Sequence, residues 1–289
     1  MDCKGRRYFH VFTKGLEDDI IFKERADFIA GMNYVPVAMA GLCIDLLAFV
    51  LMSNHFHFIV YADKHECERF IDNYKRLVSR YVRNKYGTCK ILRAVKTSCC
   101  VIEQADEGLK RLIAYVLNNP VKAGINCMPQ NYEWGSGRCY FTNYEGKSFL
   151  RRLSEFGVRQ QIAILRSGVK LNQDYIITDS GYIDPQSYID FKSVERIFVR
   201  ARSMEYFLSV SNKTSGDKDG PVSFSDSLVL SGLGEILEKK YGVENVSDLS
   251  IEVRRKVVLE IRKQFDSTPK QLARVLKCSL NEIIATLEH

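Results

Sequence analysis

Two strand-like segments joined by a two-residue turn constrain the fold of this chain most. Residues 43–52 (CIDLLAFVLM) form an apolar run rich in β-favouring side chains, and residues 55–61 (HFHFIVY) alternate imidazole and aromatic side chains. The intervening Ser53-Asn54 pair is typical of turns. Strand-like and helix-like patterns alternate from residue 6 to about residue 144. This alternation predicts an α+β domain in which helices pack on a mostly antiparallel sheet.

Helical patterns lie on both sides of these two strands. The other elements expected in the first part of the chain are a strand over 8–13 and helices over 22–34, 66–86 and 109–118. Gly87 and Pro120 are suited to end the last two helices, because glycine adopts C-cap conformations readily and proline cannot continue a helix. We expect these elements to form one domain over residues 1–145.

The chain after residue 145 divides at a polar segment. Residues 156–168 and 194–210 favour helices, so we interpret 146–222 as a mostly helical connector. Its last part, SNKTSGDKDGP, is polar and rich in helix breakers, which indicates a flexible linker over 211–221. The remaining residues, 223–289, have the pattern of a compact helical domain.

This last domain ends in a predicted helix-turn-helix. An amphipathic helix is expected over 251–265, and Pro269 suits the first turn of a short helix that follows. Ser279 then caps a final helix, with Glu282 three residues later as in a capping box. Two short helices joined by a tight turn predict contact with duplex DNA. The alternative is a small helical domain that binds protein.

Composition narrows the class of protein. The net charge of +7 and pI near 8.8 are compatible with a polyanionic partner such as nucleic acid. The nine cysteines include no Cys-x-x-Cys pair, so neither a zinc ribbon nor a disulfide framework is indicated. Scattered thiols fit a reducing compartment, and we expect a cytoplasmic protein. No segment resembles a signal peptide or approaches the roughly 20 apolar residues of a membrane-spanning helix.

The His55-Phe56-His57 sequence is the first candidate for chemistry. Side chains of a strand alternate faces, so the two imidazoles point the same way and lie roughly 6.6 Å apart at the backbone. Two imidazoles at that spacing suit one metal ion, while Phe56 and Phe58 face the core. The alternative is a pair of surface histidines on a half-exposed strand.

Tyr115 and Asn119 are the second candidate. They lie four residues apart in LIAYVLNNPVKAG, so they share one face of a helix. The amide oxygen of Asn119 is an acceptable ligand for a hard cation such as Mg²⁺ or Mn²⁺. The alternative is an amphipathic helix with a buried tyrosine and an asparagine that ends it.

A basic segment is the third candidate. Residues 73–101 contain eight Lys or Arg and no Asp or Glu, with three tyrosines interleaved. Basic groups neutralise phosphates and aromatic rings stack on unpaired bases, which favours single-stranded nucleic acid. A solvated helix face over core tyrosines is the alternative. The side chains expected to contact DNA are Lys75, Arg76, Arg80, Arg83, Lys85 and, beyond the segment, Lys122.

Together these segments resemble a known family. LMSNHFHFIV is similar to the histidine–hydrophobe–histidine motif of the IS200-like single-tyrosine (Y1) transposases, which are HUH endonucleases. AYVLNNPVKAG followed by YEWGSGRCY resembles the tyrosine helix and tryptophan segment of their REP-associated branch. The resemblance covers about the first 145 residues. Gly135-Ser136 departs from the usual Ser-Ser, and the rest of the chain has no counterpart in the compact members.

The resemblance implies a ferredoxin-like fold with the histidines on a central strand. It implies that His55, His57 and Asn119 bind Mg²⁺ or Mn²⁺, and that Tyr115 attacks single-stranded, hairpin-marked DNA. The product would be a 5′-phosphotyrosine, which a second 3′-hydroxyl can reverse to join strands without ATP. The DNA substrate places the protein at a prokaryotic nucleoid. The resemblance leaves both a monomer and a homodimer as alternatives, because some relatives dimerise and share active sites.

Three other functions remain open. A domesticated, non-catalytic regulator would bind duplex DNA through the helix-turn-helix and form no covalent adduct. A relaxase-type or replication-initiation nickase uses the same His-x-His and tyrosine chemistry. A metal-dependent hydrolase would use water in place of Tyr115.

Overall fold

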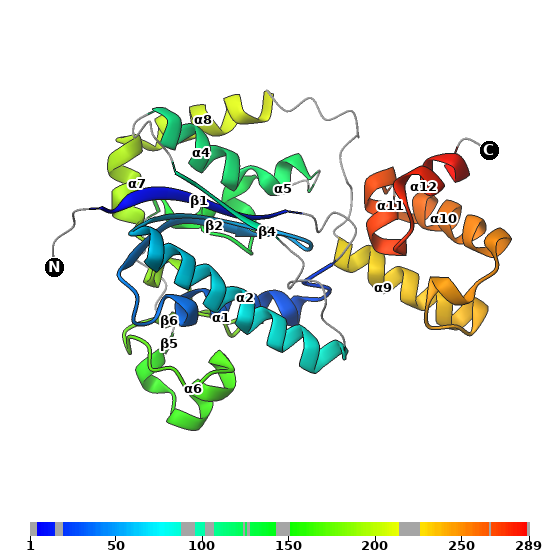
Figure 1. The fold of residues 1–289 in the computed structure, drawn as a ribbon, viewed down its shortest axis with the longest axis horizontal. Coiled ribbons are helices and arrows are strands. Elements are labelled where there is room, and N and C mark those ends of the chain that lie inside the picture. Colours follow the sequence, from blue (N-terminus) through cyan, green and yellow to red (C-terminus); the bar gives the residue numbers. More distant parts are fainter. Residues whose placement is uncertain are drawn as a thin grey trace.

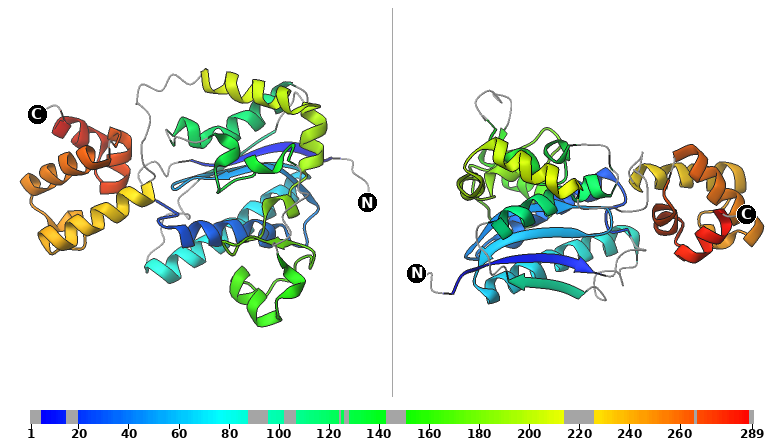
Figure 2. Two further views of the ribbon diagram at one scale, coloured as in Figure 1. Left: turned by 180° about the vertical axis from the view of Figure 1, so that it is seen from behind. Right: turned by 90° about the horizontal axis from the view of Figure 1, so that it is seen from above.

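The structure, a computed structural model, has an α+β part built on one main sheet and a smaller part made of helices (Figure 1). We call them the sheet domain and the helical domain, and the described residues of the helical domain begin at Asp226. The residues that the structure describes are 5–14, 20–87, 96–101, 107–123, 125, 128–142, 151–213, 226–265 and 267–287. Figure 2 shows the helical domain at one end of the sheet domain in both further views.

The main sheet is antiparallel throughout, as expected. Its strands are β1 (Arg7–Lys14), β2 (Ile44–Leu51), β3 (Phe56–Ala62) and β4 (Lys96–Val101), in the order β2-β3-β1-β4. β2 and β3 form a hairpin that closes around Ser53-Asn54, where Met52 N donates to His55 O at 2.8 Å. The predicted hairpin is therefore confirmed, and His55 lies directly before the first residue of β3.

Helices cover both faces of the sheet (Figure 1). One face carries α1 (Arg25–Met39) and α2 (Lys64–Tyr86), and the other carries α4 (Glu107–Leu117), α5 (Asn119–Lys122) and α8 (Ala201–Lys213). Phe56 and Phe58 of β3 both pack on Tyr74 of α2, with ring centroids 5.0 Å apart in each pair. Because strand side chains alternate, His57 faces the side of α4.

Residues 151–213 belong to the same core as the sheet, so they are more than a connector. They form β5 (Arg151–Arg152), α6 (Val158–Leu165), β6 (Ile176–Ile177), α7 (Phe191–Phe198) and α8. Asp190 N donates to Leu46 O of β2 at 2.8 Å, and Leu208 is buried in the cluster that contains the sheet. The single helix expected over 194–210 is instead two helices, broken at Val199, whose φ is 66°.

The tryptophan segment runs beside the edge strand β2. Leu51 N donates to Trp134 O at 2.8 Å, and Val50 bridges Gly135. A Cβ at position 135 would lie 2.9 Å from Phe49 O, so glycine permits this close approach.

Short 3-10 turns occur at Pro129–Asn131, Gly137–Cys139, Leu153–Glu155, Pro185–Ser187 and Val246–Asp248.

The helical domain has a hydrophobic core of its own. It contains α9 (Asp226–Ile236), a π-helical segment (Leu237–Tyr241), α10 (Ile251–Phe265), α11 (Pro269–Leu276) and α12 (Leu280–Leu287). The bounds expected for the helix over 251–265 agree with α10, and Glu282 N donates to Ser279 Oγ at 3.2 Å. The linker expected over 211–221 lies largely outside the described residues. Every described helix is too short or too polar to cross a membrane.

A buried carboxylate joins the first turn of α1 to the end of α2. Asp27 is fully buried and accepts hydrogen bonds from the hydroxyls of Tyr81 and Tyr86, both at 2.8 Å, and from Lys85 Nζ at 2.5 Å. Burial by itself would raise the pKa of Asp27, but the hydrogen bonds from Lys85 and the two tyrosines outweigh it and lower the pKa. The carboxylate therefore stays ionised inside the domain.

We expect Asp27→Ala to lower the free energy of unfolding by about 3 kcal/mol, because it leaves an ammonium and two hydroxyls without their shared acceptor. Urea denaturation followed by circular dichroism measures this change. Asp72→Ala is the matched control, since Asp72 is exposed on α2, and it should change stability by less than about 0.5 kcal/mol. Equal effects of the two substitutions would contradict the role given to Asp27.

Candidate active site

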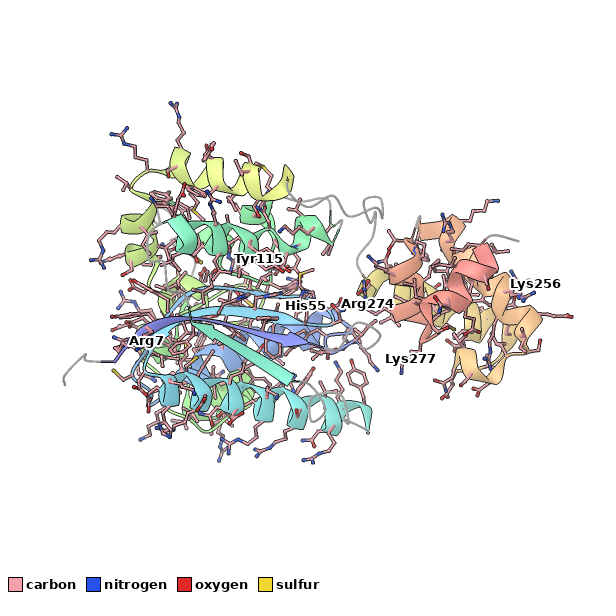
Figure 3. The ribbon with its side chains drawn as sticks, turned by 45° about the horizontal axis from the view of Figure 1, so that its top comes forward. Arg7, His55, Tyr115, Lys256, Arg274 and Lys277 are labelled. Atoms are coloured by element: carbon pink, nitrogen blue, oxygen red, sulfur yellow. The ribbon has the colours of Figure 1, made fainter. Side chains whose placement is uncertain are left out.

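The strand–helix packing brings the predicted tyrosine to the predicted histidines. The rings of Tyr115 on α4 and His57 on β3 have centroids 5.9 Å apart and are nearly perpendicular, at 84°. The rings of His55 and His57 lie 5.1 Å apart. Tyr115 keeps 39% of its surface exposed. In Figure 3, Tyr115 and His55 lie between α4 and the sheet, so the phenol is accessible yet faces the imidazoles.

Asn119 presents its amide oxygen to His55. Its Nδ2 donates to Tyr115 O at 3.0 Å and to Val116 O at 3.2 Å, which orients the side chain. Its Oδ1 then lies 3.4 Å from His55 Nε2. The helix end predicted at Pro120 permits this geometry, because α4 stops at Leu117 and α5 begins at Asn119. The expected single helix face is therefore divided between two successive helices, and the amide of Asn119 contacts Tyr115 through its backbone oxygen.

A third histidine, which the sequence analysis missed, completes the cluster. His10 Nε2 lies 3.0 Å from His57 Nδ1, and its ring lies 6.2 Å from that of Tyr115. His10 reaches the site because β1 pairs with β3 and Phe12 is opposite His57, so His10 occupies the same face two residues away. Phe9 and Val11 flank His10 and face the core, which was the available signal that His10 lies on the opposite face of its strand. The sequence does not indicate, however, that β1 pairs with β3.

Burial keeps these imidazoles neutral. Desolvation lowers the pKa of His10 to about 4 and that of His55 to about 4, in the second case against the opposing effect of Asn119. The pKa of His57 is also lowered, first by burial and then by its basic neighbours His55, His10 and Lys122. At neutral pH the cluster therefore offers uncharged ring nitrogens, which is the form that binds metals.

The hydrogen bonds of His55 show which nitrogen is available. Its Nδ1 lies 2.7 Å from Asn54 Oδ1, which can only accept, so Nδ1 carries the proton. The unprotonated Nε2 then faces Asn119 Oδ1, another acceptor, at 3.4 Å. Two ligands about 2.1 Å from one cation lie roughly 3 Å apart. The lone pairs of His55 Nε2 and Asn119 Oδ1 thus face each other at a distance that suits two ligands of one divalent cation, with His57 as a third ligand.

The donor set would leave room for substrate. No three His, Cys, Asp or Glu side chains in the described part of the chain are arranged to hold a metal ion. A cation bound here would need the amide oxygen of Asn119 beside the imidazoles. Such a weak set leaves coordination positions open for phosphate oxygens, as in catalytic sites. The residues therefore fit Mg²⁺ or Mn²⁺ better than structural zinc.

The basic side chains proposed for DNA binding separate into two groups. Lys122 belongs to the site, because its Nζ lies 4.1 Å from the centroid of the Tyr115 ring. The others lie on α2, which covers the opposite face of the sheet from Tyr115 (Figure 1). Lys85 is engaged there with Asp27 and Glu24, at 2.5 Å from each. The α2 residues, Lys75, Arg76, Arg80, Arg83 and Lys85, therefore do not line the site.

No protein-family model and no curated protein matches this chain. Among solved structures, it is similar to a REP-associated tyrosine transposase bound to a REP hairpin. The identity is 12%, the TM-score is 0.34, and the match covers 46% of this chain and 77% of that one. A likeness of this size carries no weight for function, so the functional conclusion rests on the site itself.

The buried histidines predict acid sensitivity. An unfolded histidine titrates near pH 6.5, whereas the pKa values of His10 and His55 in the folded chain are about 4. Between about pH 6.5 and about pH 4 the unfolded state binds more protons, so their contribution makes the free energy of unfolding fall as pH decreases. Urea denaturation in metal-free buffer across this range measures the slope.

His10→Gln should make this slope shallower, because it removes one of the groups that bind a proton only on unfolding. His65→Gln is the control, since His65 is exposed on α2. If the His10→Gln slope matched that of the unaltered chain, neutral burial of His10 would be wrong.

Proposed function

We propose that this chain is a transposase-like enzyme that cleaves and rejoins single-stranded DNA through Tyr115. The observation that carries the proposal is the meeting of one accessible phenol with a neutral imidazole cluster, 5.9 Å between the rings of Tyr115 and His57. The two facing acceptors of His55 and Asn119 support a divalent-metal site beside it. The proposed substrate is a hairpin-marked single strand.

In the proposed reaction, the Tyr115 oxygen attacks the phosphorus of one phosphodiester. A bond forms from the phenol oxygen to phosphorus, and the bond to the 3′ oxygen breaks. The phenol proton passes to solvent or a basic group, and the departing 3′ oxygen takes up one proton from solvent. The products are a 5′-phosphotyrosine and a 3′-hydroxyl. Attack by a 3′-hydroxyl on the phosphotyrosine reverses these bond changes and rejoins a strand.

The side chains around Tyr115 have separate parts in this reaction. Lys122 places an ammonium over the ring, where it favours negative charge on the attacking oxygen. His10 holds the ring of His57 through their shared hydrogen bond, as outer groups commonly orient metal-binding histidines. A divalent cation held by His55, His57 and Asn119 would stabilise charge on the phosphate and the departing 3′ oxygen. Lys75, Arg76, Arg80 and Arg83 of α2 would contact DNA away from the cleaved bond.

The arrangement favours catalysis over duplex-reading regulation. The second helix of the predicted helix-turn-helix, α12, contains no Lys or Arg. Arg274 of the first, α11, donates to Asp226 at 2.7 and 2.8 Å, so its charge is already engaged. Of the basic residues in and between these two helices, the exposed Lys270 and Lys277 are then left to contact duplex DNA. The order β1-α1-β2-β3-α2-β4 and the strand order lead us to propose a ferredoxin-like class for the sheet domain.

One chain supplies every proposed catalytic group. Tyr115 meets the histidines of its own chain, so cleavage does not require a tyrosine from a second protomer. We therefore propose that the active site works in cis, whether or not the protein forms a homodimer.

Tyr115→Phe should abolish cleavage and the covalent adduct while changing DNA affinity less than about twofold, because only the nucleophilic oxygen is lost. Labelled single-stranded hairpin DNA, incubated with Mn²⁺ and separated on a denaturing gel, reports the adduct as a shifted band. Tyr241→Phe, in the helical domain, is the matched control and should retain the band. An adduct of undiminished yield with phenylalanine at 115 would sink the assignment.

His57→Ala should lower the affinity for Mn²⁺ by at least about tenfold, because it removes one of the proposed ligands. Isothermal titration calorimetry measures this affinity without requiring activity. His65→Ala is the control on α2. Unchanged Mn²⁺ affinity in His57→Ala would exclude His57 as a ligand while leaving the role of Tyr115 to the adduct assay.

A further inference from the structure

A cavity of about 290 Å³ lies where the helical domain meets the sheet domain. His55 lines it, so the cavity adjoins one of the proposed metal ligands. The sheet domain contributes Arg25, Phe28 and Trp134, and the helical domain contributes Gln271 and Arg274. In Figure 3, Arg274 is on the side of the helical domain that faces His55. The cavity therefore has walls from both domains.

A buried carboxylate at the start of α9 holds the two domains together at this cavity. Asp226 accepts hydrogen bonds from Arg274 Nε at 2.7 Å, Arg274 Nη2 at 2.8 Å and Gln271 Nε2 at 3.0 Å. Ser53 Oγ, in the turn of the β2–β3 hairpin, also donates to Asp226. Ile20, before α1, packs into the hydrophobic cluster of the helical domain. The helical domain thus contacts the sheet domain at Ser53, two residues before His55 in the chain.

The charges in the cavity wall cancel. Arg274 pairs with Asp226, and Arg25 pairs with Glu133, whose two oxygens each accept at 2.6 Å. Each guanidinium group is already paired with a carboxylate, so the cavity wall has little net positive charge with which to bind a phosphate. The cavity is therefore poorly suited to an anion, although it contains two arginines.

The rest of the wall suits a flat, uncharged heterocycle. Phe28 and Trp134 are stacked with centroids 5.0 Å apart, and the Arg25 guanidinium lies 5.0 Å from the Trp134 ring. Planar aromatic and guanidinium groups are surfaces on which unpaired bases stack. Asn54 and Gln271 add amide groups to the wall, and each already takes part in a hydrogen bond there. Asn54 Oδ1 accepts from His55 Nδ1 at 2.7 Å, and Gln271 Nε2 donates to Asp226 at 3.0 Å. Stacking between aromatic or apolar side chains is a usual means of holding an extruded base.

We propose that this cavity binds one unpaired nucleobase of the DNA strand, next to the phosphodiester that Tyr115 attacks. The volume is at the lower limit for small-molecule sites, so it accommodates one base and excludes a duplex. The inference rests on the proposed function for its substrate and adds a subsite to it. The helical domain then contributes Gln271 and Arg274 to the wall around the base.

The only tryptophan of the chain provides a direct probe, because Trp134 lines the cavity. The experiment uses the full chain with Tyr115→Phe in EDTA, so that neither cleavage nor metal contributes. Single-stranded dA10, dC10 and dT10 are titrated while tryptophan fluorescence and the anisotropy of a labelled strand are recorded together. A ten-unit abasic strand has the same backbone charge and no bases. Deoxynucleoside monophosphates test whether a free nucleotide suffices.

At least one base-containing strand should change Trp134 fluorescence at saturation, and the abasic strand should bind without that change. Arg25→Gln and Gln271→Met, one from each domain, should each weaken the affinity measured by fluorescence by about fivefold or more. Gln264→Met is the matched control, since Gln264 is exposed on α10 outside the cavity. Arg25 is largely exposed, so its variant tests the cavity even if Gln271→Met unfolds the helical domain.

The inference is overturned if strands bind by anisotropy with no base-dependent change in fluorescence, or if Arg25→Gln binds as tightly as the control. A fluorescence response to monophosphates equal to that of the strands would identify the cavity as a site for free nucleotides and would also overturn the inference. An adduct in the Tyr115 assay without a base-dependent signal removes the subsite alone. A base-dependent signal without an adduct removes the cleavage reaction and leaves the subsite.

Discussion

The site depends on the two different faces of β3. Phe56 and Phe58 pack on Tyr74 of α2, and this apolar contact determines which way the strand faces. Because side chains alternate along a strand, His57 must then point to the other side, toward α4. A shift of one residue in strand register would bury the imidazole under α2 and expose a phenylalanine beside Tyr115. Packing of the core on one face therefore sets the chemistry on the other.

Burial has a second effect on the same residues. An imidazole enclosed by protein loses hydration in its charged form, so His10, His55 and His57 remain neutral at physiological pH. A protonated cluster would repel both a divalent cation and Lys122. The neutral rings are instead electron-pair donors, which suits the proposed metal. The exposed Tyr115 stays outside this enclosed region and is accessible to a strand.

The helical domain is connected to the site through a charged group that is almost fully buried. Asp226 is 6% exposed, and its bonds to Arg274 and Ser53 join α11 to the hairpin that carries His55. An arginine used in this way is unavailable to duplex DNA, which changes the interpretation of the two C-terminal helices. Gln271 and Arg274 of α11 instead form part of the wall of the cavity beside the proposed active site. Their own short helical pattern gave no indication of this location.

Much of the local structure was determined by the sequence itself. The β2–β3 hairpin, the helix over 251–265 and the Ser279 cap follow from periodicity and turn chemistry, which act over a few residues. The four-residue spacing also brought the amide of Asn119 to the backbone oxygen of Tyr115. Only the tertiary structure decided that His10 joins His57, that α2 lies across the sheet from the site, and that residues 151–213 share its core. These depend on strand pairing and domain contact between distant residues, for which local patterns carry no signal.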